Sequence, residues 1–133
     1  MIKFQILEYK DFNSYVELFK NIFGYWDNNQ RPNYIIVGLV NDTPVGFASF
    51  IRTHIDTVYL QYCGVLKEQR GRTYWKLLAG AIDQFPDTTK YVVCRISNKN
   101  TSALIIALKH GFKIIGFRST TQDDSLVELI KER

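Results

Sequence analysis

The segment from Thr57 to Phe85 constrains the fold of this chain more than any other part of the sequence. Thr57 to Cys63 is rich in β-branched and aromatic residues, as is typical of a strand. The short polar loop that follows holds Gly71 between Arg70 and Arg72. Apolar residues then recur at a helical period, at Trp75, Leu78, Ile82 and Phe85. Because free backbone N–H groups and the helix dipole converge at a helix N-terminus, this order predicts an anion-binding site.

The residues before this segment predict a strand, a helix and a meander. Residues 2–7 alternate apolar and polar side chains, which favours a first strand. A helix follows, which Asp11 or Asn13 could cap and which ends at Gly24. The spacing of Tyr15, Leu18, Phe19 and Ile22 places these apolar side chains on one face of it. Tyr25 to Pro32 has no clear period and is interpreted as a loop or a short helix. Three antiparallel strands are then expected, at 34–40, 45–51 and 57–63, with hairpin residues at 41–44.

The residues after the helix predict a second strand–helix unit and two closing strands. Tyr91 to Ile96 is almost wholly apolar, as expected of a strand buried on both faces. Strand, helix and strand in this order imply a right-handed parallel crossover. Asn100 is placed to cap a helix that runs to Leu108 and stops at Gly111, before strands at 113–117 and 126–130. We expect one α+β (mixed α/β) domain over residues 1–133. Its mixed, mostly antiparallel sheet would have about six to seven strands flanked by helices.

The basic charge is concentrated in the half of the chain that holds the polar loop. Residues 1–66 contain five basic and six acidic side chains, whereas residues 67–133 contain twelve and seven. This distribution favours an anionic ligand, although a nucleic-acid-binding protein would show the same excess. Cys63 and Cys94 have no metal-like spacing, so no metal site is expected. With neither a signal peptide nor a membrane span in view, we expect a cytoplasmic protein.

Two motifs resemble those of the GCN5-related N-acetyltransferase (GNAT) superfamily. In that family a valine and a short spacer precede Arg-Gly-x-Gly-x-Gly/Ala at the start of a helix. Here Val65 and the residues at 70–75, Arg-Gly-Arg-Thr-Tyr-Trp, occupy those places. The second motif is Asn-x-x-Ala, a helix and Lys-x-Gly-Phe, matched at 100–103 and 109–112. The resemblance implies an acyl-CoA N-acyltransferase-like fold and transfer of an acetyl group from acetyl-CoA to a primary amine in a ternary complex.

The resemblance also implies which residues bind acetyl-CoA. The coenzyme would enter between the strand that carries Val65 and the parallel strand after the helix, with its pyrophosphate on backbone N–H groups of the loop. The implied binding residues are Cys63, Gly64, Val65, Arg70, Gly71, Arg72, Thr73, Tyr74, Trp75 and Asn100. Thr73 and Trp75 replace two glycines of the motif, which is tolerable because phosphate binding needs close backbone approach rather than a particular side chain.

Two of these assignments have a plain structural alternative. Arg70 and Arg72 could be a solvated surface pair. Asn100 could serve only as a helix cap, or it could also bond the pantetheine arm.

The implied catalytic residues lie on the strand before the loop. A backbone N–H near Cys63 would polarise the thioester oxygen, provided that a bulge at Gly64 frees it. Tyr59 and Gln61 could hold a water molecule that relays the proton of the amine. For Tyr59 we favour the alternative of aromatic packing on the sheet. Ala107 stands where many family members have a tyrosine that protonates the departing thiolate, so a catalytically silent relative that binds CoA or a protein partner is an alternative.

The acceptor is an amine-bearing small molecule or protein that the sequence does not identify. Tyr25, Trp26 and Asp27 could receive its ammonium by cation–π contact and charge, or they could simply cover the core. No membrane partner is expected, and nucleic acid is disfavoured because the chain has no RNP-like strand or helix-turn-helix motif. Exposed closing strands often pair in folds of this kind, which leaves a homodimer open.

Overall fold

Seven strands form one mixed sheet with the order β1-β2-β3-β4-β5-β7-β6. The computed structural model describes residues 2–7, 12–26, 32–70, 72–119 and 125–133, with the backbone alone at 12–14, 72 and 75. The strands are β1 (Lys3–Leu7), β2 (Tyr34–Val40), β3 (Thr43–His54), β4 (Thr57–Val65), β5 (Tyr91–Ser97), β6 (Lys113–Ser119) and β7 (Ser125–Glu132). The helices are α1 (Phe12–Phe23), α2 (Arg72–Asp83) and α3 (Thr101–Lys109), with a single 3-10 turn, η2 (Lys67–Gln69), before α2.

The predicted fold class is confirmed. Strand β4 pairs with β5 in parallel, and the pairs β1–β2, β2–β3, β5–β7 and β6–β7 are antiparallel. Boundaries differ from the prediction by a few residues. Helix α2 ends at Asp83, and Phe85 instead packs its ring 5.4 Å from that of Tyr34 and 4.8 Å from that of Phe50. Phe85 therefore continues the apolar spacing of α2 although it lies in the turn after the helix, because its side chain packs in the core.

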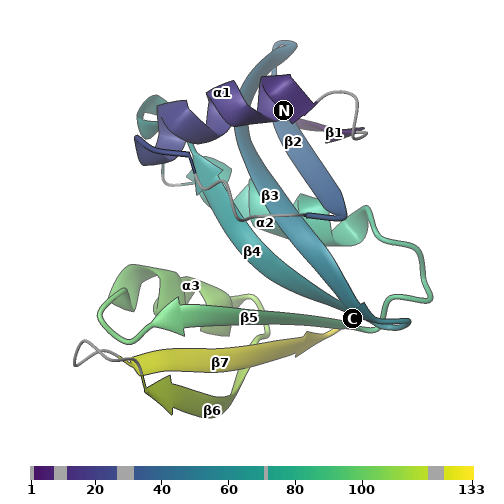
Figure 1. The fold of residues 1–133 in the computed structure, drawn as a ribbon, viewed down its shortest axis with the longest axis vertical. Helices are drawn as coiled ribbons and strands as arrows, with labels where there is room; N and C mark the ends of the chain where they lie inside the picture. The colour runs from purple at the N-terminus through teal and green to yellow at the C-terminus, as the bar shows by residue number, and fades with distance from the viewer. Residues whose placement is uncertain (1, 8–11, 27–31, 71, 120–124) are drawn as a thin grey trace. The chain divides into compact units, whose positions relative to one another are not determined.

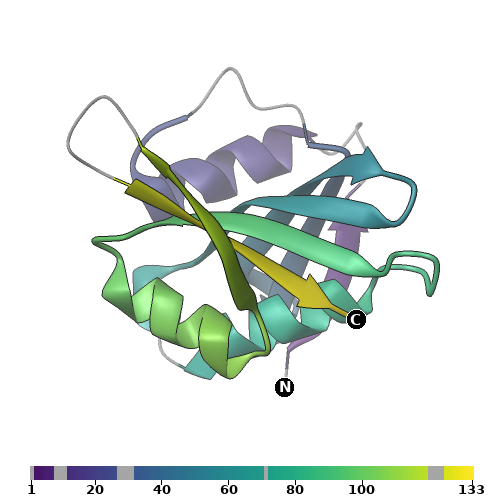
Figure 2. The same ribbon diagram turned by 90° about the horizontal axis from the view of Figure 1, so that it is seen from below.

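The chain groups into two compact units, and β3 and β4 contribute residues to both. Unit 1 comprises Met1–Ile51 and Gln61–Phe85, and unit 2 comprises Arg52–Leu60 and Pro86–Arg133. In unit 1, α1 and α2 lie on opposite faces of the sheet (Figure 1). In unit 2, α3 lies beside β5, with β7 and then β6 following it in the sheet (Figure 2).

The core of unit 1 forms where α1 meets the sheet. Tyr15 and Phe19 of α1 are fully buried, and both rings pack against that of Phe47 on β3, at 4.8 Å and 5.7 Å between ring centroids. Leu18 is buried beside them and Ile22 packs against the same cluster. The helical face predicted from the apolar spacing of these residues is therefore confirmed. Asp11 lies outside the described residues, as does the side chain of Asn13.

Two short features fix the connections that the sequence predicted. Asn41 and Asp42 both have positive φ angles, 51° and 62°, as a tight hairpin between β2 and β3 requires. Helix α3 ends before Gly111, whose φ of +89° is the left-handed conformation that a helix end favours. Among the described residues, none of the helices could serve as a membrane span.

Candidate functional site

The turn between β4 and α2 is held together by backbone hydrogen bonds. The Leu66 amide donates to the Val45 carbonyl at 2.8 Å, which ties the end of β4 to β3. The Gln69 amide then donates to the Leu66 carbonyl at 2.8 Å, and the Arg70 amide to the Lys67 carbonyl at 3.4 Å, closing the η2 turn. Gly71 lies outside the described residues.

The start of α2 has the electrostatic character that an anion requires. The helix begins at Arg72, and no acidic residue lies in its first turn to occupy the positive end of the helix dipole. Arg70 is exposed immediately before it. Thr73 and Tyr74 are half-buried in the first turn, and the side chains of Arg72 and Trp75 lie outside the described part of the chain. The positive end of the helix and the exposed Arg70 suit an anionic group such as the pyrophosphate that the family resemblance implies.

The part of β4 that leads into the turn presents two distinct faces. The ring of Tyr62 packs 5.0 Å from that of Phe19 on α1. A side chain at Gly64 would also point toward α1, because a Cβ there would lie 2.8 Å from Ile22. By strand alternation, Gln61 and its neighbours at 63 and 65 lie on the opposite face of the strand.

Gln61 is a polar residue on that face with an unsatisfied hydrogen-bond acceptor. Its side-chain oxygen, Oε1, is buried and accepts no hydrogen bond from any described residue. A buried amide oxygen without a partner costs about 1–3 kcal/mol, so such groups are rare in native structures unless a ligand or water completes them. The sequence singled out Gln61 as a polar residue on the strand before the loop. Only the folded structure reveals that its oxygen has no partner in the described part of the chain.

Gly64 has a packing role that sequence reasoning missed. We expected a glycine here to allow a bulge, whereas the contact described above shows that it lets α1 approach the strand. The bulge itself stays a prediction. A second glycine, Gly46 on β3, also allows close packing, here against β4 and α2. A Cβ at this position would lie 2.6 Å from the Gly64 carbonyl oxygen and 2.9 Å from Leu77.

Tyr59 belongs to unit 2 and is engaged by a charged pair. The guanidinium carbon of Arg95 lies 5.6 Å from the centroid of the Tyr59 ring, a cation–π contact. Arg95 also bonds Glu128, with its Nε 3.5 Å from Oε1. The Tyr59 ring therefore has a structural partner on β5, as the packing interpretation requires.

Asn100, also in unit 2, caps α3 as one of its two interpretations requires. Its Oδ1 accepts a hydrogen bond from the Ala103 amide at 3.2 Å. Ala107, at the position of the family's tyrosine, is 3% exposed and packs in the core of this unit.

Of the three residues proposed for the acceptor, two are described. Trp26 is half-buried, and its ring packs 5.4 Å from Phe19 and 5.7 Å from Tyr15. This contact supports the interpretation in which it covers the core. Tyr25 is 54% exposed, with its ring 5.6 Å from that of Phe19. Asp27 lies outside the described residues.

The cysteines and the potential metal ligands form no second functional site in the described part of the chain. Burial raises the pKa of the Cys94 thiol to about 12, so this cysteine stays protonated near neutral pH and is a poor nucleophile. Cys63 is half-buried and forms no disulfide with another described residue. Within the described ranges, no group of three or more histidine, cysteine, aspartate or glutamate side chains is arranged to hold a metal ion.

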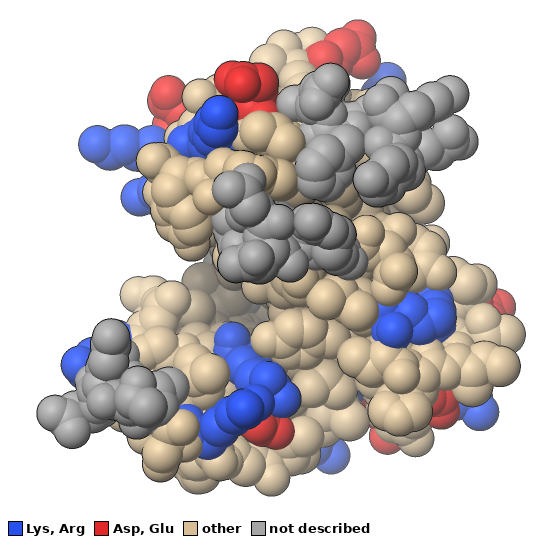
Figure 3. Space-filling model, viewed as in Figure 1, with Lys and Arg blue, Asp and Glu red and all other residues tan. Residues whose placement is uncertain are grey.

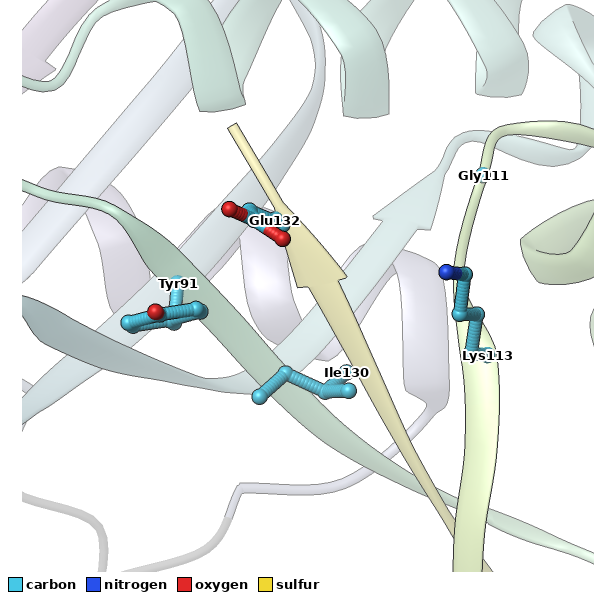
Figure 4. A pocket seen from close by; sticks show the side chains of 5 residues that line it. All are labelled: Tyr91, Gly111, Lys113, Ile130 and Glu132. Carbon is cyan, nitrogen blue, oxygen red and sulfur yellow. The ribbon is translucent and has the colours of Figure 1, made fainter.

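Unit 2 also contains a shallow pocket of about 230 Å³ that the sequence did not predict. Tyr91, Ile130 and Glu132 line it from β5 and β7, and Gly111 and Lys113 line it from the turn before β6 and the start of that strand (Figure 4). Its two charged residues are both exposed. It does not include any residue of the predicted site.

The fold is that of the acetyltransferases among solved structures. The chain is similar to the ribosomal-protein-S18-alanine N-acetyltransferase from Escherichia coli, with a TM-score of 0.79 and 18% identity, over 99% of this chain and 94% of that one. It is also similar to a putative streptothricin acetyltransferase from Bacillus anthracis in complex with acetyl coenzyme A, with a TM-score of 0.77, 15% identity and coverage of 100% and 99%. A GNAT family acetyltransferase from Elizabethkingia anophelis with acetyl-CoA bound gives a TM-score of 0.72 at 12% identity, with coverage of 99% and 98%.

The family follows from the sequence itself. The model of the acetyltransferase (GNAT) family matches residues 4–112, which include the strand, the turn and the helix described above. The chain belongs to the GNAT family of acetyltransferases. A search of curated proteins found no match.

Proposed function

We propose that this protein is an acetyl-CoA-dependent N-acetyltransferase that acetylates a primary amine of a small molecule or a protein. The observation that carries the proposal is the segment from Gln61 to Arg72. It combines three features: a strand with a buried amide oxygen that has no partner among the described residues, a closed turn, and a helix start free of acidic residues. Family membership supplies the reaction class.

In this proposal the turn and the helix start bind the pyrophosphate of acetyl-CoA. Backbone N–H groups around Gly71 would approach the phosphate oxygens, and Arg70 and Arg72 would add charge-assisted hydrogen bonds of about 1.5–3 kcal/mol each. Thr73 and its neighbours at 74 and 75 would continue the contact into the helix. When bound, acetyl-CoA supplies the thioester whose acetyl group is transferred.

The reaction is a direct transfer. The neutral amine nitrogen attacks the thioester carbonyl carbon, a C–N bond forms, the C–S bond breaks, and the amine proton ends on solvent or on the thiolate. A backbone N–H of β4 near Cys63, next to Gly64 and Val65, would donate to the thioester oxygen as negative charge develops there. Since no strong acid is assigned, most of the rate acceleration would come from positioning.

Gln61 is proposed to bind a hydrogen-bond donor that comes from outside the protein, because no described residue donates to its side-chain oxygen. Its buried Oε1 would accept a hydrogen bond from the reacting amine, from a bridging water, or from an amide of the pantetheine arm. Tyr59 is proposed to pack on the sheet rather than to act in catalysis, because its ring already has a cation–π partner in Arg95. Tyr25, with its exposed ring, and Asp27 would receive the acceptor's ammonium.

Binding is tested by calorimetry with acetyl-CoA. We expect Arg70→Glu and Arg72→Glu each to raise the dissociation constant more than about tenfold, the equivalent of one lost charge-assisted bond. Lys76→Glu is the matched control, because Lys76 is an exposed residue of α2 beyond its first turn. An unchanged constant in both arginine variants, with folding intact, would contradict phosphate binding at this turn.

Catalysis is tested by thiol release with a panel of amines and with Gln61→Leu. The variant removes a buried oxygen that has no partner among the described residues, so its melting temperature should rise slightly. If that oxygen binds the reacting amine, a bridging water or the pantetheine arm, kcat/KM should fall about tenfold or more. Ser49→Ala is the control, because Ser49 Oγ is also buried and unpartnered among the described residues. By alternation with Phe47, it lies on the α1 face of β3. A Gln61→Leu protein as active as Ser49→Ala would contradict the assignment.

One observation favours a second candidate function, that of a catalytically silent family member that binds CoA or a protein partner without transferring an acetyl group. Ala107 is buried where many family members place a tyrosine, so the described chain offers no hydroxyl there to protonate a leaving thiolate. Tight binding of acetyl-CoA without turnover on small amines, peptide N-termini or lysine peptides would support that candidate. Turnover on any of them would refute it.

A further inference from the structure

The pocket in unit 2 lies where β6 begins. Strand β6 starts at Lys113, which is opposite Ile130 of β7. Strand β7 continues beside β5 beyond this point, as far as Glu132, which is opposite Tyr91. Because β6 begins short of the end of β7, a corner of the sheet is left beside Glu132. The pocket of about 230 Å³ occupies this corner, with Gly111 at its wall.

The side chains that line the pocket share one face of the sheet. Directly paired residues on neighbouring strands point to the same face, and so do residues two positions apart on one strand. Tyr91 and Glu132 are a direct pair, as are Lys113 and Ile130, and Ile130 lies two residues before Glu132. Val92, which follows Tyr91, points to the other face and is fully buried. The pocket therefore lies on the face opposite the buried core of unit 2.

The backbone that forms the wall of the pocket is held on both sides of Gly111. Before it, the His110 carbonyl accepts a hydrogen bond from Nζ of Lys131. After it, the Phe112 amide donates to the Ala107 carbonyl at 3.0 Å, and the Phe112 side chain is 3% exposed. Gly111 itself has a φ of +89° and adds no side chain to the space. The wall is therefore fixed by the fold, and the charged side chains stand at its rim.

Two opposite charges line the pocket without pairing. Lys113 lies on one side of it and Glu132 on the other (Figure 4), and neither side chain bonds another described residue. They are diagonal neighbours in the sheet, a relationship that places backbone positions about 7–8 Å apart. Elsewhere on this face Arg95 does bond Glu128, its direct partner, and basic and acidic side chains lie side by side over β5 and β7 (Figure 3). The space between Lys113 and Glu132 can therefore take a ligand that carries both charges.

We propose that this pocket binds a free α-amino acid with an apolar side chain. The Lys113 ammonium donates to the carboxylate of the ligand, and the ammonium of the ligand donates to the Glu132 carboxylate, both as charge-assisted hydrogen bonds. The apolar side chain packs over Ile130 and the ring of Tyr91. The pocket is smaller than those for drug-sized ligands, which hold about 300–1,000 Å³, so its size suits a molecule as small as an amino acid.

Charge selects this class of ligand over simpler ions. A phosphate bound to Lys113 would lie beside the Glu132 carboxylate, and a simple amine bound to Glu132 would lie beside the Lys113 ammonium. Each arrangement places like charges together, which disfavours binding. An N-acetylated amino acid has no ammonium, so it leaves Glu132 without a partner, and the pocket therefore discriminates the free amino acid from its acetylated form. No residue assigned to acetyl-CoA lines the pocket, so amino-acid binding is independent of whether the protein transfers acetyl groups.

Binding is tested by NMR titration of the full chain with L-leucine. Because the pocket is shallow and its charged side chains are exposed, we expect a dissociation constant of about 1 mM. The backbone amides of the pocket residues at 111, 113, 130 and 132 should shift, whereas those of β2 in unit 1 should not. N-acetyl-leucine lacks the ammonium and leucine amide lacks the carboxylate, so each should bind at least about tenfold more weakly than leucine.

Variants of the two charged residues test which groups hold the ligand. Lys113→Gln and Glu132→Gln should each weaken leucine binding about tenfold or more, since each removes one charge-assisted bond. Lys109→Gln is the matched control and should bind like the parent protein, because Lys109 is an exposed lysine of α3 outside the pocket. Exchanging the charges, with Lys113→Glu and Glu132→Lys together, should bind leucine more tightly than either reversal alone. The absence of shifts at the pocket, equal affinity for the three ligands, or full affinity in both glutamine variants would each overturn the proposal.

Discussion

Arg95 holds its guanidinium carbon 5.6 Å from the centre of the Tyr59 ring, and the same side chain bonds Glu128. The contact joins β4 and β5 of unit 2 through side chains, in the part of the sheet where Tyr59 is paired with Val93. A ring that is already engaged by a cation is part of a structural network, whatever its distance from a reacting group.

We expect Tyr59→Phe to keep kcat within about twofold, because the ring and its cation–π contact remain. Tyr59→Ala should lower the free energy of unfolding by about 1 kcal/mol, the typical worth of such a contact at a partly exposed site. Urea denaturation and steady-state kinetics measure the two effects separately. A large loss of kcat in Tyr59→Phe with unchanged stability would instead assign the hydroxyl to catalysis.

The cap of α3 gives a second prediction. Asn100→Ala should destabilise the protein by about 1 kcal/mol, since the Ala103 amide loses its acceptor. Asn100→Asp should be close to the parent protein in stability, because a carboxylate accepts the same bond. Equal losses in the two variants would show that the cap bond is not what Asn100 contributes. A weaker affinity for acetyl-CoA in Asn100→Asp, at unchanged stability, would reveal a second role for its amide.

The contact between Gly46 and the Gly64 carbonyl gives a third prediction. Gly46→Ala should cost about 1–3 kcal/mol of stability, because the new Cβ would sit 2.6 Å from a backbone oxygen that cannot move aside. Gly116→Ala is the matched control on another strand, where the added methyl group meets open space and should be neutral. Thermal unfolding at low protein concentration compares them. A Gly46→Ala protein as stable as the control would contradict this packing.

His110 gives a prediction about pH. Burial, and then the positive charge of Lys131, lower the pKa of His110 below its ordinary value of 6.5. Below that pH the unfolded chain therefore binds a proton that the folded chain resists, so stability is complete above pH 6.5 and falls as the pH drops further. We expect the difference in stability between pH 7.5 and pH 5.5 to be smaller in His110→Gln than in the parent protein. Identical pH profiles would contradict the shift.

Local sequence patterns were sufficient for the elements and for the turn that precedes α2. The apolar spacing of Tyr15, Leu18 and Phe19 predicted the buried face of α1, and residues 34–40 predicted β2 at its observed bounds. Asn100 was predicted as a cap and caps α3. These features depend on side chains within a few residues of one another, so period, capping and turn chemistry record them directly.

Only the tertiary structure decided what each residue of the candidate site touches. Gly64 is explained by the approach of α1, and the Tyr59 ring by its contact with Arg95. That the buried oxygen of Gln61 has no partner among the described residues is also visible only in the folded chain. The 71% exposure of the Phe117 side chain on β6 is likewise invisible in a sequence whose apolar residues predict an ordinary closing strand. Such properties arise between segments distant along the chain, where contact, burial and the absence of a neighbour are set by how the whole sheet assembles rather than by any local pattern.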